Sequence, residues 1–297
     1  MPLFSGLAAF PITPADTDGR VDVAGVRTLV RRLVAAKVDS IGLLGSTGTY
    51  AYLARSERRR AIEAAVDEAG GAVPVMAGVG ALRTDEAVAL AKDARAAGAV
   101  AGLLAPVSYT PLLDDEVYVH FQAVAGESGL PICIYNNPGV THFTFSAALI
   151  QRLSAVDGVV AVKNPAPPTE QVAAHLADLR ARVPVGFSLG YSADANCAEA
   201  MLAGGDAWHS VLGGVFPETT LALCRAAQSG DQAETRRLNQ RLEPVWRLFR
   251  EFTGLRLAYA AAHHLGLTSA QPPRPILPLS ADGLARVAAV IDGLELR

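Results

Sequence analysis

Short apolar runs alternate with longer segments of helical character along most of this chain. Runs rich in Val, Ile, Leu and Ala predict eight strands, over residues 6–13, 40–46, 73–80, 99–107, 131–136, 159–164, 183–190 and 207–214. The polar and alanine-rich segments between them predict helices over residues 22–36, 55–69, 85–97, 114–128, 147–154, 170–179 and 193–203. Because the strand runs lack polar alternation, we expect a parallel sheet that is covered by helices on the outside.

Eight strand–helix repeats favour a closed (β/α)₈ TIM barrel over an open, doubly wound sheet. Residues 1–216 are expected to form the barrel core. Residues 217–297 are expected to form the last barrel helix and a small C-terminal helical domain, with a helix over 231–252 that Pro244 kinks. Four side chains are expected to act as helix N-caps, namely Thr84, Ser146, Thr169 and Ser192.

Composition and charge narrow the class of protein. Apolar residues make up 51% of the chain, and 26 Lys and Arg face 29 Asp and Glu, so a large core and a near-neutral surface are expected. No basic cluster stands out, which argues against nucleic-acid binding. The longest uncharged stretch, 96–113, contains two glycines and two prolines and predicts no membrane helix. Three scattered cysteines without a CxxC pair and an uncharged first segment favour a cytoplasmic protein.

Polar residues interrupt the predicted strands at the ends where the chemistry of such barrels lies. Lys163 closes the run Val-Val-Ala-Val, and a buried lysine is costly to desolvate unless it is paired. Desolvation favours the uncharged amine that attacks a carbonyl to form a Schiff base, although the ammonium could also simply reach solvent. Tyr135 could relay protons or pack as a core ring. The Gly-Ser-Thr-Gly turn at 45–48 could hold a carboxylate or be an ordinary turn.

Together, Gly-Ser-Thr-Gly at 45–48, Tyr-Asn-Asn-Pro at 135–138 and Lys163 resemble the dihydrodipicolinate synthase and N-acetylneuraminate lyase superfamily. The resemblance implies a barrel in which Lys163 forms the Schiff base with a 2-oxo acid and Tyr135 relays protons. It further implies that Ser46, Thr47 and Gly48 hold the substrate carboxylate, Thr47 sharing in the relay. Tyr109 would reach a neighbouring subunit, which makes a homo-oligomer, a dimer or a tetramer, the expected assembly.

Two departures from the family pattern concern the rest of the substrate. The lysine-biosynthesis enzymes have an arginine where this chain has Val140, and a valine cannot neutralise a carboxylate. The sialic-acid lyases place two acids after the Gly-Tyr pair at 190–191, where this chain has Ser-Ala. The residues expected to contact the rest of the substrate are Val140, His142, Gly190, Tyr191, His209 and Ser210.

The expected activity is a class I aldolase or synthase that acts on pyruvate or a pyruvate-yielding 2-oxo acid, without a cofactor or a metal. The same imine would permit loss of water from a 2-oxo-3-deoxy sugar acid, so a dehydratase is an alternative. A serine hydrolase is a third reading, because Gly-Phe-Ser-Leu-Gly at 186–190 matches the nucleophile-elbow pattern. A non-catalytic protein that binds a 2-oxo acid is the fourth.

Overall fold

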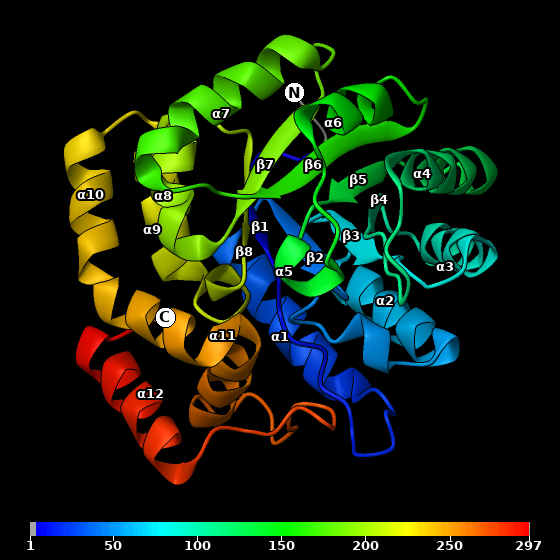
Figure 1. Ribbon diagram of the computed structural model, residues 1–297. Coiled ribbons are helices and arrows are strands. Elements are labelled where there is room, and N and C mark those ends of the chain that lie inside the picture. Colours follow the sequence, from blue (N-terminus) through cyan, green and yellow to red (C-terminus); the bar gives the residue numbers. More distant parts are fainter. Residues whose placement is uncertain (1–3, 297) are drawn as a thin grey trace.

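A closed barrel of eight parallel strands forms the centre of the computed structural model, which describes residues 4–296 (Figure 1). Neighbouring strands pair in chain order, and β8 closes on β1. The strands are β1 Gly6–Ala9, β2 Ser40–Leu43, β3 Val75–Gly78, β4 Ala101–Leu104, β5 Ile132–Tyr135, β6 Val159–Pro165, β7 Ser188–Ser192 and β8 Ala207–Ser210. The predicted barrel is therefore confirmed, and most strands are shorter than predicted because their apolar ends continue into loops.

Helices follow the strands and surround the barrel (Figure 1). They are α1 Val23–Ala36, α2 Arg55–Ala69, α3 Thr84–Ala96, α4 Asp114–Ser128, α5 Pro138–Thr141, α6 Ala147–Ser154, α7 Thr169–Arg182, α8 Asp194–Leu202 and α9 Pro217–Gln228, with short 3₁₀ turns η1 Tyr50–Tyr52 and η2 Leu212–Gly214. Of the predicted N-caps, Ser146 is confirmed, since its side chain accepts from the Leu149 amide. The other three are wrong, because α3 and α7 begin at Thr84 and Thr169 themselves and Ala193 precedes α8.

Two apolar clusters divide the core. The larger one lies between the strands and the surrounding helices, and the smaller one fills the barrel interior around Phe10, Met76 and Leu103. The phenyl ring of Phe10 reaches across to β2, where any side chain at Gly42 would collide with it. The large ring of Phe10, the residue directly after β1, therefore closes the barrel beneath the carboxyl ends of the strands.

Three more helices follow the barrel, α10 Gln232–Arg241, α11 Glu243–His264 and α12 Ala281–Leu294. The predicted helix over 231–252 is divided in two at Leu242, two residues before the expected kink. Pro244 itself lies in the first turn of α11, where its missing amide costs no hydrogen bond. A second break, inside α11, falls at Thr253, with φ 67° and ψ 157°. Beyond it, the Tyr259 hydroxyl donates to the Thr13 carbonyl over 3.4 Å and ties α11 to the loop after β1.

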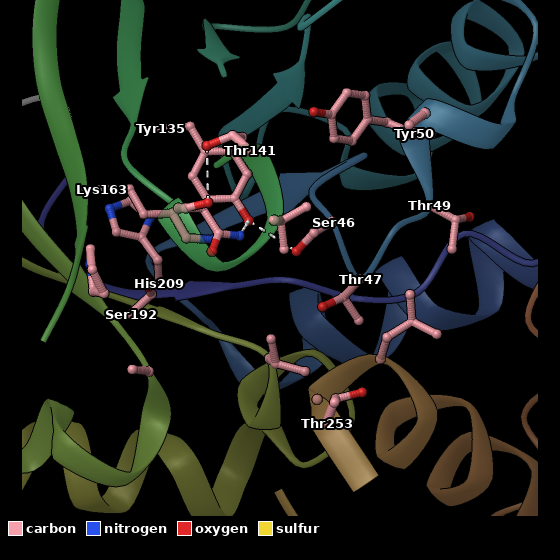
Figure 2. Close-up of a pocket in the computed structure, with 18 of the residues that line it drawn as sticks. Ser46, Thr47, Thr49, Tyr50, Tyr135, Thr141, Lys163, Ser192, His209 and Thr253 are labelled. Atoms are coloured by element: carbon pink, nitrogen blue, oxygen red, sulfur yellow. Dashed lines mark hydrogen bonds between the residues drawn. The ribbon is translucent and has the colours of Figure 1, made fainter. Parts of the chain in front are cut away.

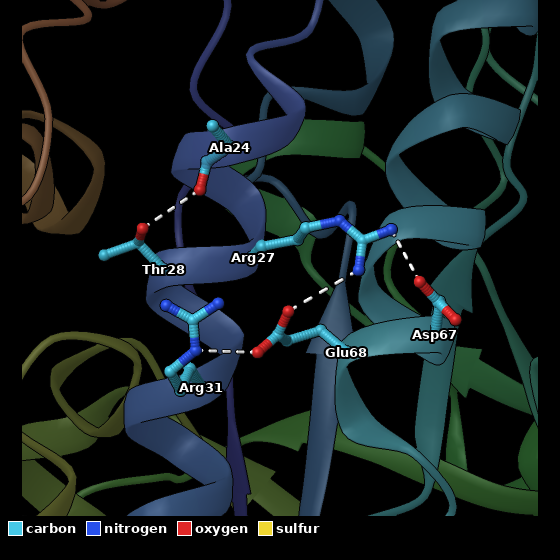
Figure 3. Close-up of polar contacts among 6 residues, drawn as sticks. All are labelled: Ala24, Arg27, Thr28, Arg31, Asp67 and Glu68. Atoms are coloured by element: carbon cyan, nitrogen blue, oxygen red, sulfur yellow. Dashed lines mark hydrogen bonds and ion pairs between the residues drawn. The ribbon is translucent and has the colours of Figure 1, made fainter.

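Ion pairs link neighbouring outer helices. Figure 3 shows Arg27 of α1 between Asp67 and Glu68 of α2, at 2.6 and 3.5 Å, with Arg31 at 2.8 Å from Glu68. Asp67 and Arg31 are exposed, and Arg27 and Glu68 are only partly buried, so each pair contributes little to stability. Within residues 4–296, no helix is long and apolar enough to cross a membrane.

Candidate active site

The Lys163 side chain points into the carboxyl end of the barrel from β6. Its Nζ atom lies 3.7 Å from the centre of the Phe10 ring and 4.5 Å from the centre of the Tyr135 ring. The residue is 4% exposed, and within residues 4–296 its amine makes no hydrogen bond or ion pair. The amine is thus held between two rings, with its lone pair or proton free for a ligand.

Tyr135 is the second group at this centre. The β5–β6 pairing places it directly beside Lys163 in the register. Its hydroxyl shares a hydrogen bond of 2.9 Å with Ser46 Oγ, and the Asn137 side-chain amide donates to it, also over 2.9 Å (Figure 2). Since Asn137 fills an acceptor site, the phenol proton is directed toward Ser46 or toward a ligand.

The turn after β2 presents Ser46 and Thr47 to the same space. Thr47 is buried, and both residues line a cavity of about 650 Å³ together with Tyr135 and Lys163. Two non-glycine residues of this turn, Leu44 and Thr49, have positive φ angles of 56° and 53°. Strained backbone of this kind persists where the surroundings enforce it, often beside functional groups.

His209 also lines the cavity, from β8, and it lies on the Lys163 side of Figure 2. It is 1% exposed, and neither ring nitrogen has a hydrogen-bond partner among the described residues. Burial, and to a smaller extent the Lys163 charge, hold the pKa of His209 well below its usual range, so the imidazole is neutral at pH 7.

The cavity contains six of the predicted site residues, namely Ser46, Thr47, Tyr135, Val140, Lys163 and His209. Gly190 does not line the cavity, because its Cα faces the His209 ring and a side chain there would collide with Nε2. Gly190 therefore makes room for the imidazole.

Five further expectations do not match the cavity lining. Tyr191 and Ser210 are fully buried; the Tyr191 hydroxyl shares a 3.0 Å hydrogen bond with His175 Nδ1, and Ser210 Oγ accepts from the Gly213 amide. Gly48 is buried against the Leu44 backbone.

His142 is exposed at the end of α5, and Tyr109 is 98% exposed in the loop after β4. In this chain none of the five lines the cavity.

The serine-hydrolase reading is contradicted at its nucleophile. Ser188 is the first residue of β7 and is fully buried. Its hydroxyl donates to the Phe4 carbonyl over 2.8 Å, so it faces the closed side of the barrel. A nucleophile elbow requires the serine at the opposite end of a strand, on an exposed turn.

Several residues at the centre were not predicted. Phe10 lies inside the first apolar run, and Asn137 belongs to the Tyr-Asn-Asn-Pro motif, so both had a sequence signal. Asp194 had a weaker one as an acid in a first helical turn. It lies buried beside the cavity, where its carboxylate accepts from Trp208 Nε1 over 2.7 Å and the Leu212 amide over 2.9 Å, and burial raises its pKa. The α11 residues had no signal at all.

Within residues 4–296, no cluster of three or more His, Cys, Asp or Glu side chains has the arrangement of a metal site. The three cysteines are buried and unbridged. The side chains that line the cavity offer an amine, a phenol, a neutral imidazole and the buried Asp194 carboxyl.

Comparison with known proteins decides the family. A model described as the dihydrodipicolinate synthetase family matches residues 3–294. The chain belongs to this family. It is 38% identical, over 86% of each chain, to a 4-hydroxy-tetrahydrodipicolinate synthase of Methylococcus capsulatus, and 36% identical to one of Thiobacillus denitrificans, over 96% of this chain and 95% of the relative.

Solved structures agree with this assignment. A dihydrodipicolinate synthase of Agrobacterium tumefaciens superposes with a TM-score of 0.96 at 55% identity, over 98% of both chains. A dihydrodipicolinate synthase of Acinetobacter baumannii, solved with pyruvate, superposes with a TM-score of 0.90 at 26% identity, over 99% of both chains. The protein is therefore a pyruvate-using, Schiff-base-forming lyase of the dihydrodipicolinate synthase family.

Proposed function

We propose that Lys163 captures the C2 carbonyl of pyruvate or of a pyruvate-yielding 2-oxo acid. The observation that carries this role is the position of its buried amine, 3.7 Å above the Phe10 ring and beside the Tyr135 phenol. The protonated imine then withdraws electrons and so stabilises a carbanion at C3. C3 can therefore act as the nucleophile in condensation or as the leaving carbon in cleavage. The first step needs proton transfers at the carbinolamine, and Tyr135 with Ser46 supplies them.

The substrate carboxylate binds at the turn after β2 in this proposal. Ser46 and Thr47 line the cavity beside Tyr135, and the turn places their hydroxyls and amides at the end of a strand. Such turns hold anions through converging N–H and O–H donors. The carboxylate then fixes C2 of the 2-oxo acid near the Lys163 amine.

The active assembly is proposed to be a homo-oligomer in the cytoplasm. Tyr109 is 98% exposed in this chain, which is unusual for a tyrosine beside the mouth of a site. Delivery of this phenol into the site of a neighbouring subunit would account for its exposure. The unbridged cysteines fit a reducing compartment.

The reaction after which the curated relatives are named, 4-hydroxy-tetrahydrodipicolinate synthesis, is the second candidate. Against it, the expected arginine position holds Val140, which lines the cavity and is 57% exposed. No cation lies in α5, where that arginine would be. We therefore favour an aldolase with another acceptor, and a dehydratase is distinguished from it by loss of water without release of pyruvate.

Incubation with pyruvate and borohydride, followed by intact mass and peptide mapping, tests the proposal. We expect one reduced pyruvate adduct per chain on Lys163, absent from Lys163→Ala. Lys37→Ala, at an exposed position that ends α1, is the matched control and should keep the adduct. An adduct that persists in Lys163→Ala, or none in the unaltered protein, would refute the assignment.

A further inference from the structure

The cavity has an apolar part that the imine chemistry does not use. The turn after β2 and the ends of β5 and β6 supply the imine centre. The apolar part comes from the loop after β4, from α5, from the residue after β8, from α11 and from the chain before α12. We call these side chains the outer lining: Val107, Val140, Val211, Phe249, Leu255 and Ile276. A volume of about 650 Å³ leaves ample room beyond pyruvate, a molecule of six heavy atoms, for a second reactant.

Three of the hydroxyl groups near this outer lining already donate to backbone carbonyls. Thr141 donates to the Asn137 carbonyl over 3.1 Å, Ser192 donates to the Asn164 carbonyl over 3.2 Å, and Ser108 donates to the Thr110 carbonyl. A sugar chain in this space would lose its water contacts and find few donors to replace them, which is costly. An apolar chain would lose nothing and would cover Val140, which is 57% exposed.

One charged group borders this region. Arg256 of α11 is half-buried, lines the cavity, and donates to Thr253 Oγ1 over 3.5 Å. Within residues 4–296 it has no carboxylate partner. This guanidinium would favour an acidic acceptor, and succinic semialdehyde is the compound that tests for such a preference.

We propose that the acceptor of this enzyme is an apolar aldehyde, aliphatic or aromatic, whose hydrocarbon part binds against the outer lining. The proposal rests on the pyruvate imine described above. A base in the site removes a C3 proton from that imine, and the C–H electron pair forms the enamine. C3 then bonds to the aldehyde carbon, the C=O pair moves to oxygen and takes a proton, and water hydrolyses the imine to a 4-hydroxy-2-oxo acid. Atoms and electrons balance without an oxidant or a reductant.

The test pairs pyruvate with hexanal, benzaldehyde, erythrose or succinic semialdehyde, which are acceptors of similar size, and follows 4-hydroxy-2-oxo acid formation by NMR. We expect kcat/KM for hexanal or benzaldehyde to exceed that for erythrose and succinic semialdehyde by about tenfold or more. Preference for erythrose or succinic semialdehyde would overturn the proposal while leaving the imine intact. If borohydride traps no pyruvate, the proposed function fails first and takes this inference with it.

Val211→Thr adds one hydroxyl to the outer lining at nearly constant volume. We expect it to lower kcat/KM for hexanal by roughly three- to tenfold and to leave the yield of the pyruvate adduct unchanged. Val119→Thr, on the exposed face of α4, should change neither. If Val211→Thr does not fold, Phe249→Leu serves the same comparison with benzaldehyde.

Discussion

The Lys163 amine of β6 lies on the face of the Phe10 ring, 3.7 Å from its centre, and Phe10 directly follows β1. β1 and β6 are not neighbours, so this contact exists because the barrel closes. The ring both attracts a cationic amine and limits its motion. The same ring packs edge-on against His209, with centroids 5.7 Å apart.

We expect Phe10→Leu to slow borohydride trapping of pyruvate by about 2- to 30-fold, the range that corresponds to one ring–cation contact. Phe121→Leu is the matched control, since Phe121 is a fully buried ring outside the barrel interior. Both variants should lose stability, and only the first should trap more slowly. Equal trapping rates would show that the ring does not orient the amine.

Ser46→Ala removes the 2.9 Å hydrogen bond to the Tyr135 hydroxyl. Because the proton relay then lacks the hydroxyl beside Tyr135, kcat should fall about 10- to 100-fold. Ser46→Thr keeps a hydroxyl and should retain most of the activity. Steady-state kinetics with pyruvate and an active aldehyde would measure the effect. Ser192→Ala removes another cavity hydroxyl, one that donates to a backbone carbonyl, and should change kcat little. The relay is wrong if the two alanine variants behave alike.

Tyr109→Phe should be poorly active if its phenol completes a neighbouring site. Mixing Tyr109→Phe with Lys163→Ala, after subunit exchange, should then restore about a quarter of the unaltered activity, because half of randomly paired dimers carry one intact site. Sedimentation of each variant checks that assembly is unaffected. Full activity of Tyr109→Phe, or no recovery on mixing, would assign the relay to a single chain.

His209 makes stability depend on pH. Its pKa lies well below the usual value in the folded state, so below about pH 6.5 the unfolded chain binds a proton that the folded chain does not. Stability therefore falls as the pH drops, by up to about 1.4 kcal/mol per pH unit from this group. Urea unfolding at pH 7.5, 6.5 and 5.5 should show a shallower loss for His209→Gln than for the unaltered protein. Parallel curves would mean that the imidazole is protonated in the folded state.

The barrel and its imine centre could be predicted because both follow from short segments. Apolar runs without alternation indicate buried parallel strands, and a lysine or tyrosine at the end of such a run must lie at the barrel mouth. Lys163 and Tyr135 are found there, in register on neighbouring strands. Both side chains then lie near Phe10 because the sheet closes into a barrel.

Which way each strand side chain points was harder to predict. Successive residues alternate between the barrel interior and the helices, so a shift of one position exchanges the two sides. On β7, Ser188 and Gly190 face the barrel interior. The next residue, Tyr191, points outward to His175. Because the strand segments are apolar throughout, the sequence does not show which of their residues face the barrel interior and which face the helices.

The contribution of α11 could not be predicted from local pattern. Tyr259 contacts Thr13, which lies 246 residues earlier, and no short motif reports so distant a pairing. The same holds for Phe249 and Arg256, which lie on either side of the break at Thr253 and both line the cavity. The sequence pattern predicted an interruption near Pro244, which the structure has at Leu242, but not the extension of α11 to His264 or its break at Thr253.

The bend of α11 at Thr253 has a consequence for how this enzyme could diversify. Strand ends hold the amine and the phenol, while a helix outside the eight-fold repeat supplies Phe249, Leu255 and Arg256. Substitutions near the bend can thus alter which partner molecule is accepted without disturbing the bond-making centre. Exchange of this helix between relatives should transfer acceptor preference as a unit.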